Sequence, residues 1–226
     1  ELIFENDADG EGGYDAGAPG KVDNAVKFSG VGRLLADDLN NLDFPEDQDF
    51  TAMAWLKLPA DPTGFEPLVD KRTPQGEAER GWYFTTIEGR VGLRMADADG
   101  LSGAWVSPQL IGDGEWHHVA VTVDRSESNG IRFYVDGVQA GPPNDATLVP
   151  GDLSTDADIS IGASQRLDGA GSLPALVGTL DEVQIFHRSL FPNEVFDIAD
   201  ADCGGVCKIR MHISRITPFC GPQPQS

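Results

Sequence analysis

The chain has 226 residues, of which 40% are hydrophobic and 23% are charged, and its formal net charge is −21. This balance is typical of folded globular proteins and excludes wholesale disorder. The length suits one large β-sandwich domain. The strong negative charge argues against non-specific binding to nucleic acid or to anionic membranes, because both would repel the chain, and it favours cations or basic partners.

Short runs rich in β-branched and aromatic residues alternate with Gly, Pro, Asp and Asn clusters, which is the pattern of a sandwich or barrel. About a dozen strands are predicted, near residues 1–4, 25–29, 33–36, 49–58, 66–71, 82–87, 90–96, 104–107, 116–124, 131–139, 157–161 and 177–187. The run 50–58 is apolar on both faces, which predicts a central strand. Asp136-Gly137 predicts a tight hairpin turn. One short helix is predicted over residues 192–199, with Pro192 at its first position.

No apolar run approaches the roughly 18–20 residues that span a bilayer, and the N-terminus has no signal pattern. The sequence begins at Glu1 rather than at Met, so we expect a processed mature chain or an excised domain.

Six runs, taken in chain order, resemble the laminin G-like jelly rolls of the concanavalin A-like lectin/glucanase superfamily. They are the Asp-Ala-Asp-Gly turn at 7–12, the strand at 19–30, Phe50-Thr51 to Trp55-Leu56-Lys57, Trp116-His117-His118-Val119-Ala120-Val121-Thr122-Val123-Asp124, Phe133-Tyr134-Val135-Asp136-Gly137, and the closing segment at 178–195. The resemblance implies an all-β, two-sheet antiparallel jelly-roll β-sandwich over residues 1–202, with a short C-terminal helix. It also implies a secreted, extracellular or cell-surface setting. It does not identify a ligand, because this fold hosts lectins, hydrolases and adhesion modules alike.

The resemblance further implies a structural calcium ion where the N-terminal Asp turn meets the final strand. Asp7 and Asp181 match the positions of the carboxylates, and Asp9, Glu11 or nearby carbonyls would complete a shell of hard oxygen ligands. The alternative is that Asp-Ala-Asp-Gly is merely a turn, since the same four residues recur at 97–100.

The last segment, residues 203–226, differs in composition from the rest. It contains three basic and no acidic residues, a net charge of +3 against −24 for the remainder. Residues 208–214 alternate polar and apolar side chains, which predicts an extra strand that adds to an open sheet edge. We favour docking on its own body, and the alternative is docking on a neighbouring copy, which would give rings or filaments. An extracellular setting favours one disulfide over zinc or free thiols, between Cys220 and either Cys203 or Cys207.

Aromatic residues that stack on sugar rings are the candidates for a ligand site. Trp82, Tyr83 and Trp105 are expected to be exposed, with Arg72 and Arg80 nearby, and the alternative is that these rings fill the sandwich.

Four further aromatic residues are assigned structural roles. Trp55 and Trp116 are expected in the core. His117 and His118 are neighbours on one strand, so they face opposite sides and do not chelate one ion together.

Catalytic patterns are not apparent in the sequence. It has no carboxylates spaced along one strand as in retaining glycosidases, no Gly-x-Ser-x-Gly elbow and no cysteine nucleophile within the predicted core. We therefore expect that the protein is not an enzyme. We expect a calcium-stabilised binding or adhesion module that recognises a glycan or an extracellular protein. We expect neither nucleic-acid binding nor membrane insertion. The alternatives are a structural subunit of an extracellular fibre or matrix assembled through the tail, or, third, a polysaccharide-degrading enzyme.

Overall fold

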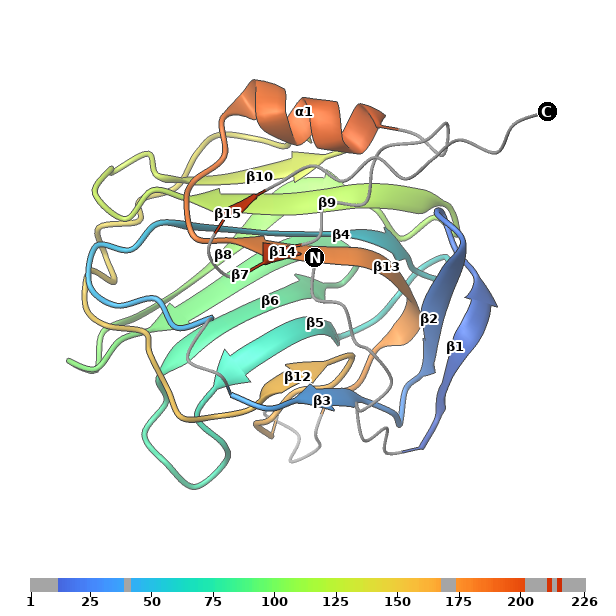
Figure 1. The fold of residues 1–226 in the computed structure, drawn as a ribbon, viewed down its shortest axis with the longest axis horizontal. Coiled ribbons are helices and arrows are strands. Elements are labelled where there is room, and N and C mark those ends of the chain that lie inside the picture. Colours follow the sequence, from blue (N-terminus) through green and yellow to red (C-terminus); the bar gives the residue numbers. More distant parts are fainter. Residues whose placement is uncertain (1–11, 39–41, 168–173, 202–210, 213–214, 217–226) are drawn as a thin grey trace.

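The computed structural model describes residues 12–38, 42–167, 174–201, 211–212 and 215–216. Two large antiparallel sheets stack face to face, and one helix packs on the outer side of the first sheet (Figure 1). The seven-stranded sheet has the order β1 (Tyr14–Pro19), β2 (Asn24–Ser29), β13 (Val177–Phe186), β4 (Phe50–Lys57), β9 (Trp116–Val123), β10 (Ile131–Val135) and β11 (Val138–Gln139). The six-stranded sheet has the order β3 (Leu34–Ala36), β12 (Ile159–Ile161), β5 (Phe65–Arg72), β6 (Gly81–Ile87), β7 (Arg90–Ala96) and β8 (Ser102–Leu110).

Strand β4 is buried on both faces, as its sequence predicts. Phe50, Ala52, Ala54 and Leu56 belong to the main core between the two sheets. Met53, on the opposite face, packs in a smaller cluster with Val195 of helix α1 (Pro192–Asp200). Helix α1 therefore covers part of the outer side of the seven-stranded sheet. It does not cover the outer side of the six-stranded sheet.

The predicted all-β, two-sheet fold is confirmed, and so are the short helix and the Asp136-Gly137 turn. Both turn residues have positive φ angles, 51° and 76°, so the range 131–139 divides into β10 and β11. Strand β1 was not predicted, because Tyr14–Pro19 contains Gly, Pro and Asp and lacks a β-branched residue. The expected strand at 1–4 lies outside the described residues.

The tail is described only at Met211–His212 (β14) and Arg215–Ile216 (β15), which pair with each other in a separate two-stranded sheet. The other residues of 203–226, with all three cysteines, lie outside the described part of the chain. Docking of the tail, its disulfide and its role in assembly therefore stay predictions. Among the residues that the structure describes, no helix has the length and apolar character needed to cross a membrane.

Candidate functional site

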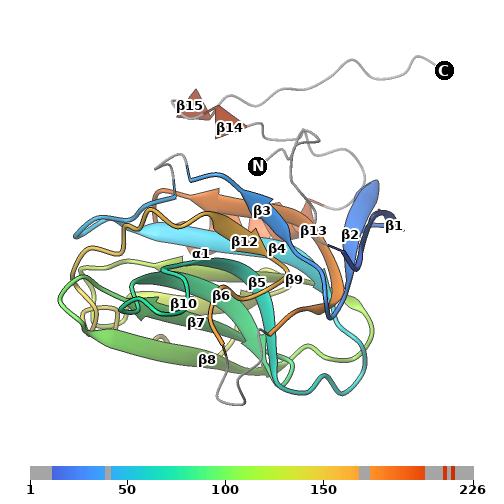
Figure 2. The same ribbon diagram turned by 90° about the horizontal axis from the view of Figure 1, so that it is seen from below.

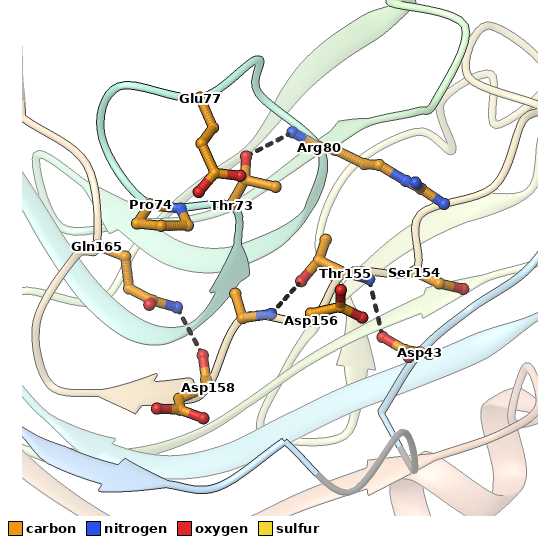
Figure 3. A pocket seen from close by; sticks show the side chains of 11 residues that line it. Asp43, Thr73, Pro74, Glu77, Arg80, Ser154, Thr155, Asp156, Asp158 and Gln165 are labelled. Carbon is orange, nitrogen blue, oxygen red and sulfur yellow. Dashed lines mark hydrogen bonds between the residues drawn. The ribbon is translucent and has the colours of Figure 1, made fainter.

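A pocket lies among loops at one end of the six-stranded sheet, and we call it the loop pocket. It has a volume of about 610 Å³. One wall is the β5–β6 loop, with Thr73, Pro74, Glu77 and Arg80; the other is the segment before β12, with Ser154, Thr155, Asp156, Ala157 and Asp158, together with Asp43 and Gln165 (Figure 3). The lining therefore combines hydroxyl, carboxylate, amide and guanidinium groups.

Hydrogen bonds fix the walls of the loop pocket. The Thr155 amide donates to a carboxylate oxygen of Asp43 at 3.1 Å, and the Gln165 amide group donates to the Asp158 carbonyl at 2.7 Å. On the facing wall, the Thr73 hydroxyl accepts a hydrogen bond from the Arg80 amide at 3.1 Å. The polar groups are thus held in place before any ligand arrives.

A buried cation holds together several segments that line the pocket. Lys71 is 0% exposed, and its ammonium group donates to the carbonyls of Thr155 and Ala157, each at 2.7 Å. It also lies 3.0 Å from the Asp38 carboxylate and 3.4 Å from that of Asp43. Lys71 therefore ties three segments together, and this matches the rule that buried charges are paired.

Arg80 stands at the rim of the pocket and forms an ion pair with Asp152. Partial burial opposes ionisation of Asp152, but hydrogen bonds from Ser154 and the charge of Arg80 outweigh it and lower the pKa of this carboxyl group. The pair is therefore ionised at neutral pH. The arrangement suits a neutral, hydroxyl-rich ligand that exchanges many hydrogen bonds.

The structure does not bring the four predicted ligand residues together. Arg80 lines the loop pocket, but Arg72 is buried in an ion pair with Asp70. Trp105 is half-buried on β8, the edge strand of the sheet (Figure 2).

The expectation that Trp82 and Tyr83 are exposed is wrong. Trp82 is 0% exposed, packs on Phe44 and Phe50, and donates from its indole nitrogen to the Leu42 carbonyl at 3.1 Å. Tyr83 is 5% exposed on the other face of β6. A tryptophan with its N–H satisfied is well suited to a core, so the alternative reading is the correct one for Trp82.

The core roles expected for Trp55 and Trp116 are also wrong, because both rings are half-buried. Trp55 lies on the outer face of β4, where the ammonium group of Lys21 is 4.6 Å from its ring centroid and the His118 ring meets it edge-on. Trp55 and Met53 lie on the same face of β4, because side chains alternate along a strand, and this face is the one that α1 packs on. The helix covers Met53 but not Trp55.

The two histidines have the core and hydrogen-bonding roles expected of them. His117 is paired with Asp136 at 2.8 Å and with Asp113 at 3.1 Å. His118 is 2% exposed, and its burial lowers its pKa to about 4. The pair therefore has hydrogen-bonding and packing roles.

Asp181 is the one member of the predicted calcium site in the described part of the chain; Asp7, Asp9 and Glu11 lie outside it. Its carboxylate is buried and accepts hydrogen bonds from the amides of Val22 at 2.8 Å and Glu182 at 2.9 Å. It thus holds the β1–β2 turn against β13. Within the described ranges, no three His, Cys, Asp or Glu side chains gather into a set that could hold a metal ion.

Sequence reasoning missed most of the loop pocket. Asp43 lies 30 positions before Thr73 of the β5–β6 loop, and Thr155 and Asp158 lie more than seventy positions after Arg80 at its other end. All three are in irregular segments, and nothing in their local sequence marks them. One signal was present in the sequence. Lys71 stands among buried residues of β5, and a lysine at such a position requires hydrogen-bond acceptors around its ammonium group.

Comparisons with known proteins agree with this architecture. The family model described as the concanavalin A-like lectin/glucanases superfamily, a laminin G model, matches residues 33–196. Neuronal pentraxin-1 of Rattus norvegicus and that of Homo sapiens are each 29% identical over 163 residues, which are 69% of this chain and 34% of theirs. The chain thus spans about a third of the length of these curated relatives.

Solved structures share the fold at low sequence identity. The binding domain of Paraclostridial Mosquitocidal Protein 1 has a TM-score of 0.65 at 16% identity, covering 88% of this chain and 48% of that one. The botulinum neurotoxin serotype D ligand binding domain, in complex with N-acetylneuraminic acid, has 0.61 at 13%, covering 86% and 46%. Domain 4 of AbnA, a GH43 extracellular arabinanase from Geobacillus stearothermophilus, in complex with arabinotriose, has 0.57 at 20%, covering 84% and 82%. On the evidence of its fold and of a family model that matches most of its length, the chain belongs to the laminin G-like proteins of the concanavalin A-like lectin/glucanases superfamily.

Proposed function

We propose that this chain is a non-catalytic, extracellular carbohydrate-binding module and that a glycan binds in the loop pocket. The observation that carries the proposal is the pre-organised polar lining of that pocket. Its two walls present hydroxyl, carboxylate and amide groups to a space of about 610 Å³. A volume of this size is typical of small-ligand sites. Pro74 offers an apolar surface against which a sugar ring can pack.

Structural neighbours support the same class of ligand. The serotype D domain was solved with N-acetylneuraminic acid and the AbnA domain with arabinotriose. These similarities concern the fold, so they favour a glycan without naming one.

The test is a glycan array followed by titration calorimetry with the best oligosaccharide. Glu77 and Asp156 are exposed on opposite walls of the pocket. We expect Glu77→Ala and Asp156→Ala each to weaken binding about tenfold without changing the melting temperature, since a hydrogen bond to a charged group contributes about 1.5–3 kcal/mol.

Glu127→Ala is the matched control, because Glu127 is also exposed and its carbonyl accepts a hydrogen bond, as that of Glu77 does, but it lies on the turn after β9. It should leave binding unchanged. A blank array, or equal affinity in all three variants, contradicts the proposal. Release of reducing ends from the bound polysaccharide would contradict the non-catalytic assignment.

Calcium binding at Asp181 stays a proposal of its own. In its support, the carboxylate is buried and held in place by two backbone amides, so it would present a pre-oriented oxygen ligand. The ion would stabilise the junction of the β1–β2 turn with β13.

A further inference from the structure

The outer face of the six-stranded sheet carries a second hollow, the sheet-face pocket, whose chemistry differs from that of the loop pocket. Its volume is about 430 Å³. Much of its wall is apolar, formed by Phe65, Ile87, Leu167 and Pro174. Phe65 is 49% and Leu167 is 46% exposed, so two large apolar side chains at this pocket remain in contact with water.

The other end of the sheet-face pocket is cationic. Arg72, Arg94 and Arg166 contribute to it, against the carboxylates of Glu79 and of Asp70, which pairs with Arg72. Three guanidinium groups against two carboxylates leave a local positive charge in a chain whose net charge is −21.

Hydrogen bonds orient these arginines. Glu79 accepts from Nε and Nη2 of Arg94 and from Nη1 of Arg72, and the bonds from Arg94 lower the pKa of Glu79 to about 2. Nη1 of Arg94 has no hydrogen bond among the described residues. Arg166 donates to the carbonyls of Thr73 and Pro74 and has no ion pair with any described residue. Donors are thus available in the pocket.

Tyr83 supplies a third kind of group. It is 5% exposed, lies directly across from Arg94 in the β6–β7 ladder, and its ring centroid is 4.0 Å from the Arg72 guanidinium carbon. Its hydroxyl is buried and forms no hydrogen bond of good geometry within the described ranges. The hydroxyls of Thr85 and Ser164 lie near it, but they donate to other acceptors, the carbonyls of Glu66 and Arg166 among them. Burial raises the pKa of Tyr83 to about 12, so the hydroxyl keeps its proton at neutral pH. A buried polar group without a partner is costly, and a ligand oxygen would satisfy it.

We propose that the sheet-face pocket binds a small organic anion with a carboxylate group and an apolar body. The carboxylate accepts hydrogen bonds from the Tyr83 hydroxyl and from Nη1 of Arg94, while the apolar body packs against Phe65 and Leu167. The apolar wall disfavours a neutral sugar, because burying its hydroxyl groups without partners is unfavourable. This site is separate from glycan binding in the loop pocket.

The test is titration calorimetry of the full chain with benzoate and hexanoate and with their neutral counterparts benzamide and hexanamide. We expect the carboxylates to bind and the amides to bind at least about tenfold more weakly, because charge-assisted hydrogen bonds are roughly twice as strong as neutral ones. Tyr83→Phe should weaken benzoate binding about tenfold. It should leave the melting temperature unchanged or raise it, because the hydroxyl it removes is unsatisfied.

Tyr134→Phe is the matched control: the Tyr134 hydroxyl is also buried and forms no hydrogen bond of good geometry in the described part of the chain, but Tyr134 belongs to the cluster under α1. It should leave benzoate binding unchanged, and Arg94→Gln should weaken it even if Tyr83→Phe proves unstable. Equal binding of benzoate and benzamide, no binding of either carboxylate, or unchanged affinity in Tyr83→Phe would overturn the proposal. Glycan binding in the loop pocket should persist in Tyr83→Phe, which separates the two proposals.

Discussion

The ammonium group of Lys71 lies 2.7 Å from the Thr155 carbonyl, although the two residues are 84 positions apart. This contact joins the end of β5, which leads into one wall of the loop pocket, to the segment before β12, which forms the other wall. Lys71 is 0% exposed, whereas the side chains of its partners Asp38 and Asp43 keep only 12% and 14% of their surface accessible, so water can replace only part of its contacts.

Lys71→Met should therefore destabilise the protein by about 3–5 kcal/mol, the usual cost of breaking a buried ion pair by removing one partner. Urea unfolding measures the change. Lys27→Met, at an exposed position of β2, should change the unfolding free energy by less than about 0.5 kcal/mol. Similar values for the two variants would mean that Lys71 does not hold the loops.

His117 should make the protein less stable as the pH rises above about 6.5. Burial opposes its charge, but Asp136 and Asp113 outweigh this and raise its pKa. Its pKa in the unfolded chain is about 6.5, so the stabilisation is fully present below that pH and is lost as the pH rises through the folded value. Urea unfolding across this range should show a decline that His117→Gln removes. An unchanged slope in the variant contradicts this assignment.

His118 should act at lower pH and in the opposite direction. Burial lowers its pKa to about 4. Between about pH 6.5 and 4 the unfolded chain therefore takes up a proton that the folded chain does not, and stability falls as the pH falls, by up to about 3 kcal/mol. His118→Phe should abolish this part of the acid sensitivity in urea titrations. His187→Gln, at an exposed position, should retain it.

Asp181 should make the melting temperature respond to calcium. An ion bound only by the folded state adds about 2.7 kcal/mol at a hundredfold excess over its dissociation constant. Asp181→Asn keeps one acceptor oxygen for the turn but loses the charge, so the difference between calcium and chelator should disappear. Asp99→Asn, in the second Asp-Ala-Asp-Gly turn, should keep the full difference. A wild-type curve that is identical in calcium and in chelator removes the ion from this site.

The positions of most strands follow from the sequence by itself, because alternation, β-branched runs and turn residues act locally. The Asp136-Gly137 dipeptide predicts its turn, and the two-faced apolar run of β4 predicts a central strand. Helix α1 forms where Pro192 allows its first turn, although Phe191 offers no capping side chain; the Glu194 carboxylate instead accepts from the Phe191 amide at 2.8 Å.

Only the tertiary structure decided which face of each strand became the core. Alternation places Trp82 and Tyr83 on opposite faces of β6, but it does not say which face the second sheet covers. That depends on strand order, which placed Trp82 against Phe44 and Phe50 and turned Tyr83 toward Arg94. Both pockets likewise depend on residues distant in sequence, such as Lys71 with Thr155 and Thr73 with Arg166. Such residues become neighbours only when distant strands pair within the sheets, and the local sequence does not determine which strands pair.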